Sequence, residues 1–434
     1  MVQLSAAAQC RVSACSSLKR RSVSQSDTSV MPRHVGDVGT RSPSPTARVM
    51  ALPASYAVLR CVQLIALGIN ALLLARVLGL HQYALYARGA FFATAFTAVG
   101  FFGQDQLAYR HRIASRILLK RTVGIVTVVF LATSALAICT TARANWPTII
   151  SSCVGTAGIA ITTVRFLAAQ IAGRDDHRAI GQLLNTVSVQ VSGVVAAYLG
   201  GGAFVATTTA TAISWLWVAG TIRQKQSVQV RKAAPFREGV AVGIGGIAYA
   251  SIPAIASIIV AIRATDAAAA EDRFLLLAFS ALLGMAGALN SEYFRARLFH
   301  PDVKAKAFEA VKIRMIKVNV ATVCCAVSAL CVAGLLARYV IPVRYGSVGG
   351  PLIALSAVVP ISFGSVVLFN LELARGRMAR AIGRNVAAAI AALVAMLVVT
   401  PTPYHLVAVV VSSEACGLAV FAVAALWPAR DRLS

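Results

Sequence analysis

Residues 183–222 read LLNTVSVQVSGVVAAYLGGGAFVATTTATAISWLWVAGTI. This stretch contains two apolar runs, near 183–201 and 204–222, that are separated only by the glycines around Gly201. Each run is about as long as the roughly 20 residues that an α-helix needs to cross a bilayer. A cluster of glycines favours a tight turn. The stretch therefore predicts two consecutive membrane-spanning helices joined by a short turn.

The composition of the whole chain supports the same interpretation. Of its 434 residues, 58% are hydrophobic and 13% are charged, and the mean hydropathy is +0.75. A soluble domain has about a quarter of its residues charged. The chain is therefore expected to be an all-α protein that crosses a membrane many times.

Twelve apolar segments along the chain are long enough to span a bilayer. They run near 57–75, 84–102, 122–141, 147–164, 183–201, 204–222, 240–262, 274–290, 316–337, 351–371, 386–402 and 405–427.

The basic residues orient these predicted spans. The chain has 41 Lys and Arg against 15 Asp and Glu, a net charge of +26. With the N-terminus inside, the inside loops hold 26 of the basic residues and the outside turns hold six. Because basic residues favour cytoplasmic loops, both termini are predicted to be cytoplasmic. The charge is thus expected to face anionic membrane lipid and not nucleic acid.

The predicted spans form two halves that carry similar short motifs. Arg-Ala-Ile-Gly occurs at Arg178–Gly181 and again 202 residues later at Arg380–Gly383. We expect a six-helix lobe at 51–222, a basic cytoplasmic linker at 223–237 and a second six-helix lobe at 238–434. Residues 1–50 are rich in Ser, Lys and Arg, and we expect them to be disordered; the alternative is that translation starts at Met31 or Met50.

Motifs that would indicate catalysis are missing from the sequence. It has no GxxxxGK[ST] phosphate-binding loop, no HExxH and no GxSxG, and its cysteines and histidines have no metal-ligand spacing. We therefore expect a protein that is not an enzyme, with no cofactor and no metal site.

Charged and amide side chains inside or beside the spans are the candidate site residues. An intramembrane charge is costly, so it usually faces a cavity or a partner. The planar guanidinium suits phosphate oxygens. We therefore expect a cavity for a diphosphate, formed by residues of both halves: Arg60, Arg88, Arg273 and Asn70. The alternatives are that Arg60 extends to the interface at a helix end and that Asn70 only bonds between helices.

Two acidic side chains are candidates for ion coupling. Glu414 lies in the middle of the twelfth span and Glu372 lies at the end of the tenth. Each could carry a coupling proton, while Glu414 could instead pair with an arginine and Glu372 could extend to the interface.

The second and tenth spans carry a family resemblance. The stretch ALLLARVLGLHQYALYARGAFFATAFTAVGFFGQDQLAYRHR (residues 71–112) has an ARxLG motif, a Tyr-containing turn, an aromatic-rich span and an Arg/His cluster. It resembles the opening of polysaccharide and O-antigen flippases. RYGSVGGPLIALSAVVP (residues 344–360) is similar to the turn before their tenth span.

The resemblance implies a MATE-like fold of about 12 transmembrane helices in two six-helix lobes, from the multidrug/oligosaccharidyl-lipid/polysaccharide exporter superfamily. It implies that an undecaprenyl-diphosphate-linked oligosaccharide is flipped across the bacterial inner membrane by alternating access, for O-antigen, capsule or exopolysaccharide synthesis. It also implies coupling to H⁺ or Na⁺ and allows a polysaccharide polymerase as a partner.

Three other functions remain open. A cation-coupled multidrug antiporter of the same fold would need acidic cavity residues, and the spans contain few. A membrane scaffold would have no use for charges inside spans. An enzyme of lipid or sugar transfer would need carboxylates on an outside turn, where Asp266, Glu271 and Asp272 are the candidates.

Overall fold

The computed structural model describes residues 54–99, 115–171, 175–222, 256–287, 289–290, 294, 305–341, 348–375, 377–398 and 404–426. Every regular element among these residues is helical, as expected for an all-α membrane protein. The predicted disordered segment 1–50 and the linker 223–237 lie outside the described residues.

The helices of the two halves follow the predicted spans. Those before residue 222 are α2 (Ala54–Val77), α3 (Leu80–Val99), α5 (Ser115–Thr140), α6 (Trp146–Ile171), α7 (Asp175–Tyr198) and α8 (Ala203–Ile222), with a short 3₁₀ helix, η1 (Arg143–Asn145), before α6. Those after residue 255 are α10 (Asp266–Gly287), α12 (Ala305–Val340), α13 (Gly349–Ala374), α14 (Met378–Val398) and α15 (His405–Leu426). Residues 256–263 are also helical.

Eight of these helices are long and apolar enough to cross a membrane within the described part of the chain. They are α5, α6, α7, α8, α12, α13, α14 and α15, and each coincides with a predicted span. The predicted spans at 57–75, 84–102 and 274–290 correspond to α2, α3 and α10. Most of the predicted span at 240–262 lies outside the described residues.

Large apolar side chains cover the outward faces of the helices. Val128, Leu131, Leu216, Leu335 and Leu397 are each more than 60% exposed. Such a surface would aggregate in water, whereas in hydrocarbon it meets a solvent as apolar as itself. The helices are also suited to that solvent because they satisfy their backbone hydrogen bonds internally. The chain is a multi-pass membrane protein.

The glycine turn between α7 and α8 is as tight as its sequence predicts. Gly200 has a φ of 90°, a conformation that glycine adopts without steric cost. The backbone N–H groups of Gly200 and Gly201 donate to the carbonyls of Ala197 and Ala196, at 3.1 Å each. The side-chain oxygen of Gln82, on α3, accepts from the N–H of Ala203 at 2.9 Å and caps the start of α8.

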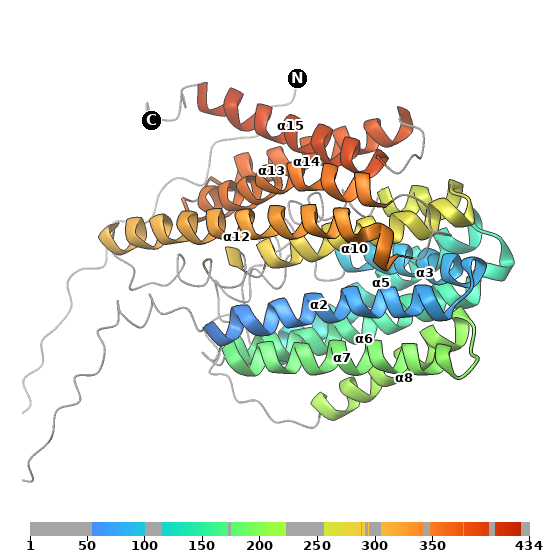
Figure 1. The fold of residues 1–434 in the computed structure, drawn as a ribbon. Helices are drawn as coiled ribbons and strands as arrows, with labels where there is room; N and C mark the ends of the chain where they lie inside the picture. The colour runs from blue at the N-terminus through green and yellow to red at the C-terminus, as the bar shows by residue number, and fades with distance from the viewer. Residues whose placement is uncertain are drawn as a thin grey trace, which may run out of the picture. The chain divides into compact units, whose positions relative to one another are not determined.

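Helices α2, α6, α7 and α8 pack side by side (Figure 1). Small residues let α6 and α8 approach closely enough for hydroxyls of α8 to reach the backbone of α6. Ser214 donates to the carbonyl of Gly155 at 2.9 Å, and Thr211 donates to the carbonyl of Ser151 at 2.8 Å. A Cβ atom added at Gly158 would lie 2.4 Å from the Ser214 hydroxyl oxygen. This contact resembles the small-residue interfaces by which membrane helices pack.

We expect Gly158→Leu to destabilise the α6–α8 contact by about 1–3 kcal/mol, the range observed for overpacked cores. The measurement is the thermal stability of the detergent-solubilised protein. Gly124→Leu on α5 is the matched control, because nothing lies within 4 Å of a Cβ atom added at Gly124. Equal stability of the two variants would contradict close packing at Gly158.

Candidate functional site

Helix α10 contacts helices of both halves of the chain. It packs against α2 and α3 of the first half and against α13 and α15 of the second. Three charged residues of α10 point to different neighbours: Asp266 contacts α3, Arg273 lies beside Tyr86 of α3, and Asp272 contacts α15. The side chains of α10 therefore connect the two halves.

A cavity of about 370 Å³ lies beside α10. Its walls come from α2, α3, α6, α7, α8 and α10. This volume is within the range of about 300–1,000 Å³ that is common for small-molecule sites. The cavity is therefore the candidate ligand site.

The polar lining of this cavity is neutral except for Arg273. Hydroxyl and amide groups face it from six helices, and no carboxylate is present among the lining residues that the structure describes. The polar lining residues are Asn70, Tyr86, Thr94, Ser152, Thr156, Gln190, Thr207, Thr211, Arg273 and Ser280.

Two buried polar atoms at this cavity have no hydrogen-bond partner among the described residues. One is the side-chain oxygen of Asn70, an acceptor, and the other is Nε of Arg273, a donor. The amide nitrogen of Asn70 donates to the side-chain oxygen of Gln190, across from α2 to α7. The Arg273 guanidinium lies 5.9 Å from the centre of the Tyr86 ring. Because buried polar groups are nearly always satisfied, both atoms are available to a polar ligand.

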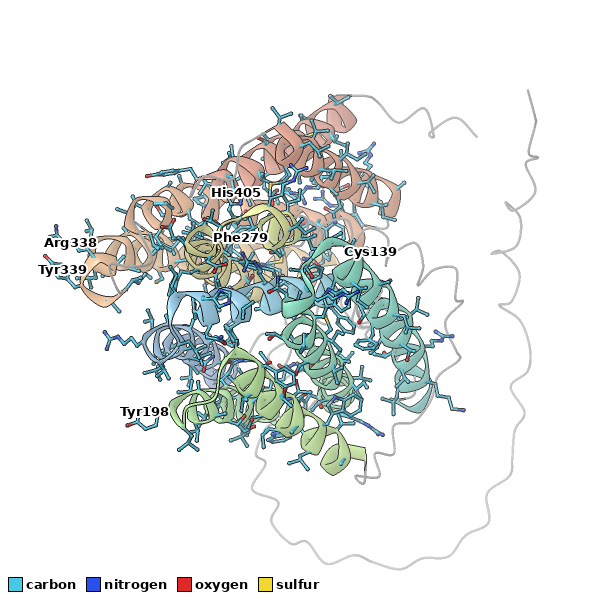
Figure 2. All side chains as sticks on the ribbon, turned by 90° about the vertical axis from the view of Figure 1, so that its right-hand side faces the viewer. Cys139, Tyr198, Phe279, Arg338, Tyr339 and His405 are labelled. Atoms are coloured by element: carbon cyan, nitrogen blue, oxygen red, sulfur yellow. The ribbon has the colours of Figure 1, made fainter. Side chains whose placement is uncertain are left out.

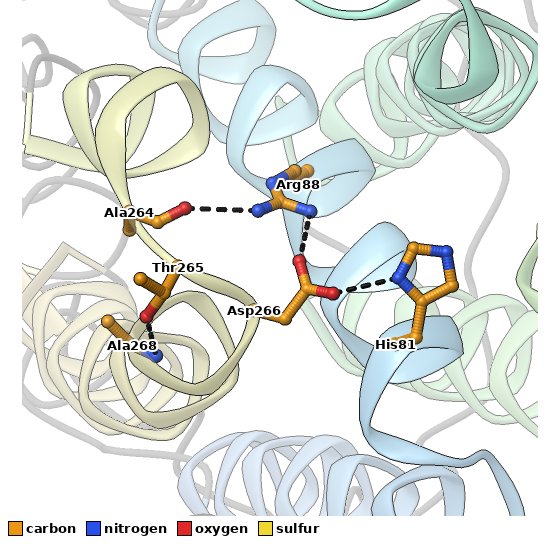
Figure 3. A network of polar contacts seen from close by, with 6 residues as sticks. All are labelled: His81, Arg88, Ala264, Thr265, Asp266 and Ala268. Carbon is orange, nitrogen blue, oxygen red and sulfur yellow. Dashed lines mark hydrogen bonds and ion pairs between the residues drawn. The ribbon is translucent and has the colours of Figure 1, made fainter.

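Arg88 belongs to a separate network near the start of α10 (Figure 3). Its guanidinium donates to a carboxylate oxygen of Asp266 at 2.7 Å and to the carbonyl of Ala264 at 3.0 Å. The other carboxylate oxygen of Asp266 lies 2.7 Å from Nδ1 of His81. Arg88 is thus not among the residues that line the cavity. It joins α3 to α10 instead.

The two partners of Asp266 determine its protonation. Burial raises the pKa of this carboxyl, but the hydrogen bonds and charges of His81 and Arg88 lower it by more. The pKa of Asp266 therefore lies below its ordinary value, and the carboxylate is charged at neutral pH. The network also connects the two halves of the chain, because α3 and α10 belong to different halves.

Glu414 lies in a fully buried ion pair with Arg384. The side chains are 2% and 0% exposed. The hydroxyl of Ser365 donates to the same carboxylate oxygen at 2.5 Å, and Arg384 also donates to the side-chain oxygen of Asn385 at 2.8 Å. The contact joins α14 to α15. Since arginine does not lose its proton in proteins, this pair holds the Glu414 charge in place.

The other two predicted site residues lie at helix ends. Glu372, near the end of α13, has a carboxylate oxygen 3.3 Å from Arg375 and 3.6 Å from Arg377. Arg60 lies in α2, ten residues and about 15 Å before Asn70 along the helix. The side chain of Arg60 lies outside the described residues. The structure thus places Asn70 and Arg273 at one cavity. The roles predicted for Arg60, Arg88, Glu372 and Glu414 stay predictions.

The sequence did not single out most of the polar lining. Gln190, Thr207 and Thr211 are mildly polar residues in otherwise apolar spans, so they carry no catalytic or ligand-binding motif. The one available signal was the run Thr207–Thr211, which contains four threonines in five residues. Arg384 lies just before the predicted span at 386–402, whereas the structure places it within α14.

Comparisons with known proteins identify the fold. No known family model matches the sequence, and no curated protein is detectably similar to it. Solved structures do match over most of the chain. One is a ligand-bound structure of the MATE multidrug transporter DinF-BH, with a TM-score of 0.61 and 11% identity over 86% of this chain and 96% of that one.

The fold is MATE-like. A transporter of the MOP superfamily from Pyrococcus furiosus, described as having a binding pocket of reverse polarity that suggests a different function, matches with a TM-score of 0.59 and 12% identity. That match covers 88% of this chain and 95% of the other. An inward-facing multidrug resistance MATE family transporter matches with a TM-score of 0.54 and 14% identity, over 85% and 97% of the two chains.

This result confirms the predicted MATE-like fold. The matching structures are described as transporters, and at these identities the likeness shows the fold alone. Identities of 11–14% do not distinguish between substrates.

We expect Asp266→Asn to lower the thermal stability of the protein at neutral pH, by about 1 kcal/mol or less because the pair is partly exposed. The folded-state pKa of Asp266 is depressed, so its contribution is complete above the unfolded-state value of about 3.9. It is lost as the pH falls through the folded-state pKa. The difference in melting temperature between wild type and variant should therefore be full above about pH 5 and should shrink below about pH 4.

The control for this pH series is Glu309→Gln, which removes an exposed carboxylate of α12 whose ion-pair partner among the described residues is the nearby Lys312. It should leave the melting temperature almost unchanged. A difference between wild type and Asp266→Asn that grows as the pH falls would contradict the assignment.

We expect Glu414→Gln and Arg384→Gln each to destabilise the protein by about 3–5 kcal/mol, because each leaves a buried charge without its counter-ion. The double variant should recover part of this loss, since it removes both charges. A double-mutant cycle on the thermal or denaturant stability of the solubilised protein measures the coupling. Strictly additive losses would show that the two side chains do not interact.

Proposed function

We propose that the protein flips an oligosaccharide linked to a lipid diphosphate, of the undecaprenyl type, across the bacterial inner membrane. In this role it would supply the lipid-linked oligosaccharide for the synthesis of a surface polysaccharide such as O-antigen, capsule or exopolysaccharide. The observation that carries the proposal is the charge of the cavity: one arginine, many neutral hydroxyl and amide groups, and no carboxylate among its described lining residues.

Arg273 fits the anionic part of such a ligand. A guanidinium presents donors in a planar fork that matches phosphate oxygens. Within the described residues Arg273 forms no ion pair, and its Nε is buried without a partner. A bound diphosphate would satisfy that donor and neutralise the charge. An arginine in an apolar environment is costly, so its presence in the cavity favours an anionic ligand.

The neutral lining fits the sugar part of the ligand. Sugar hydroxyls both donate and accept hydrogen bonds, as do Ser, Thr, Asn and Gln side chains. Asn70 offers a buried carbonyl oxygen, while Thr207, Thr211 and Ser152 offer hydroxyls on the opposite helices. The lining provides many polar groups without fixed charge, which suits an uncharged, hydroxyl-rich ligand of variable composition.

Alternating access supplies the mechanism. In transporters built from two similar halves, the halves rock about a site that lies between them. The Arg88–Asp266 contact joins the halves beside the predicted outside turn. Opening of the cavity to the outside would break that contact and exchange it for solvent. We propose this as the role of Arg88, in place of the predicted direct contact with the diphosphate.

The orientation in the membrane is part of the same proposal. The predicted inside loops hold 26 basic residues and the outside turns hold six, which supports cytoplasmic termini. A lipid-linked sugar assembled in the cytoplasm would then enter from the side on which the basic loops attract anionic lipid.

The second candidate is a cation-coupled multidrug antiporter. It is favoured by two of the structural neighbours, which are described as multidrug transporters. A lipophilic cation would be attracted by carboxylates and repelled by Arg273. The charge of the cavity therefore distinguishes the two candidates, although the fold does not.

We expect purified full-length protein to bind undecaprenyl diphosphate and not a lipophilic cationic dye. Arg273→Ala should weaken binding of undecaprenyl diphosphate by about tenfold or more, equivalent to about 1.4 kcal/mol. Arg273→Lys should have an intermediate effect, because it keeps the charge without the planar fork. Titration of each probe into the detergent-solubilised protein gives the Kd values.

The matched control is Arg263→Ala, which removes an exposed arginine near the predicted outside turn and should leave the Kd for undecaprenyl diphosphate unchanged. Tight binding of the dye together with no binding of the diphosphate would overturn the proposal in favour of the antiporter.

A further inference from the structure

We propose that Asp272 and His405 form a proton-binding site between α10 and α15. The use of this proton to drive or gate export rests on the function proposed above, whereas the binding of the proton does not. The site contains neither of the two glutamates that the sequence suggested for ion coupling.

The geometry is that of a buried, directly contacting pair. Nε2 of His405 lies 3.3 Å from a carboxylate oxygen of Asp272. The side chains are 3% and 8% exposed. His405 is the first residue of α15, and Asp272 is in the second turn of α10. Figure 2 shows His405 close to the helix that carries Phe279, which is α10.

The partner of each buried carboxylate decides what the pair can do. Glu414 has an arginine, which stays protonated at every physiological pH, so that pair is a fixed structural contact. Asp272 has a histidine, the side chain whose charge ordinarily changes between about pH 5 and 8. Of these two buried pairs, only the second can gain or lose a proton under physiological conditions.

Neither charge of the pair is favourable alone at this degree of burial. An isolated buried carboxylate or imidazolium is costly, so the pair retains one proton and is neutral as a whole. Uptake of a second proton from water leaves a neutral carboxylic acid beside an imidazolium. Release of that proton to water restores the neutral pair. Each step changes the net charge of the α10–α15 contact by one.

Among the described side chains, the other charged groups of the helices that pack against α10 either have other partners or lie next to Asp272 on α10 itself. Glu271 and Arg273 flank Asp272 on α10, and Arg273 faces the cavity. The remaining groups and their partners are Arg76 of α2 with the Val340 carbonyl, His81 and Arg88 of α3 with Asp266, Glu372 of α13 with Arg375 and Arg377, and Glu414 of α15 with Arg384. Histidine is therefore the cationic partner that the described structure gives to Asp272.

Asp272 is next in sequence to a residue that lines the candidate ligand site. Asp272 contacts α15, and the next residue, Arg273, lines the cavity and lies beside Tyr86 of α3. A change in the attachment of α10 to α15 would thus move the side chain that we propose binds the diphosphate. Protonation and ligand binding would then be linked, and each would alter the affinity for the other by the same factor.

The experiment is infrared difference spectroscopy of the full chain reconstituted in lipid, recorded as a pH titration. The absorption of a protonated carboxylic acid should increase as the pH is lowered and the pair takes up its second proton. Asp272→Asn should abolish this absorption. His405→Gln should shift its midpoint to higher pH by about one unit or more, because the buried carboxyl group loses the cationic neighbour that stabilises its charged form.

The control is Glu309→Gln, which should leave the titration unchanged. The proposal is overturned if Asp272→Asn leaves the absorption intact, or if His405→Gln does not shift its midpoint. If Asp272→Asn does not fold, the His405→Gln titration decides alone. The experiment needs no transported substrate, so failure to bind undecaprenyl diphosphate would refute the proposed function and leave this site standing.

Discussion

A charged side chain within a bilayer must find a partner inside the protein, and this constraint shapes the described structure. Glu414 pairs with Arg384, Asp266 with Arg88 and His81, and Asp272 with His405. The first pair joins the consecutive helices α14 and α15, whereas the partners of Asp266 and Asp272 lie on helices that are distant in sequence. Because removal of one partner leaves an uncompensated charge in a poor solvent, these contacts also determine which helices lie next to each other.

Arg273 departs from this pattern within the part of the chain that the structure describes. Its guanidinium lies against the Tyr86 ring and lines the cavity, and its Nε has no protein partner. Arg165 also has a buried Nε without a partner, but it lies near the predicted cytoplasmic end of α6, where a long side chain can reach water. Arg273 is the arginine that contacts the candidate ligand site, and this is why we base the proposed function on it.

The fold could be predicted from the sequence because membrane spans are determined locally. The glycine turn around Gly200 and the apolar runs of α5 to α8 and α12 to α15 follow from length, hydropathy and turn residues alone. Side-chain pairing between helices could not be predicted in the same way. Nothing near Glu414 in the sequence indicates Arg384 as its partner. Arg88 was expected at the cavity, because the sequence does not indicate its contact with Asp266, which is 178 residues away. Asn70 and Arg273 were predicted by residue type, and the structure places both at one cavity.

The proposed function requires this cavity to carry a lipid-linked glycan. The decisive measurement is to delete the gene and to determine on which side of the membrane lipid-linked oligosaccharide accumulates. The proposed function predicts that surface polysaccharide is lost, that the lipid-linked precursor is trapped on the cytoplasmic side, and that wild-type protein restores export whereas Arg273→Ala does not. Normal surface polysaccharide together with increased sensitivity to lipophilic cations would contradict it and would indicate a multidrug antiporter.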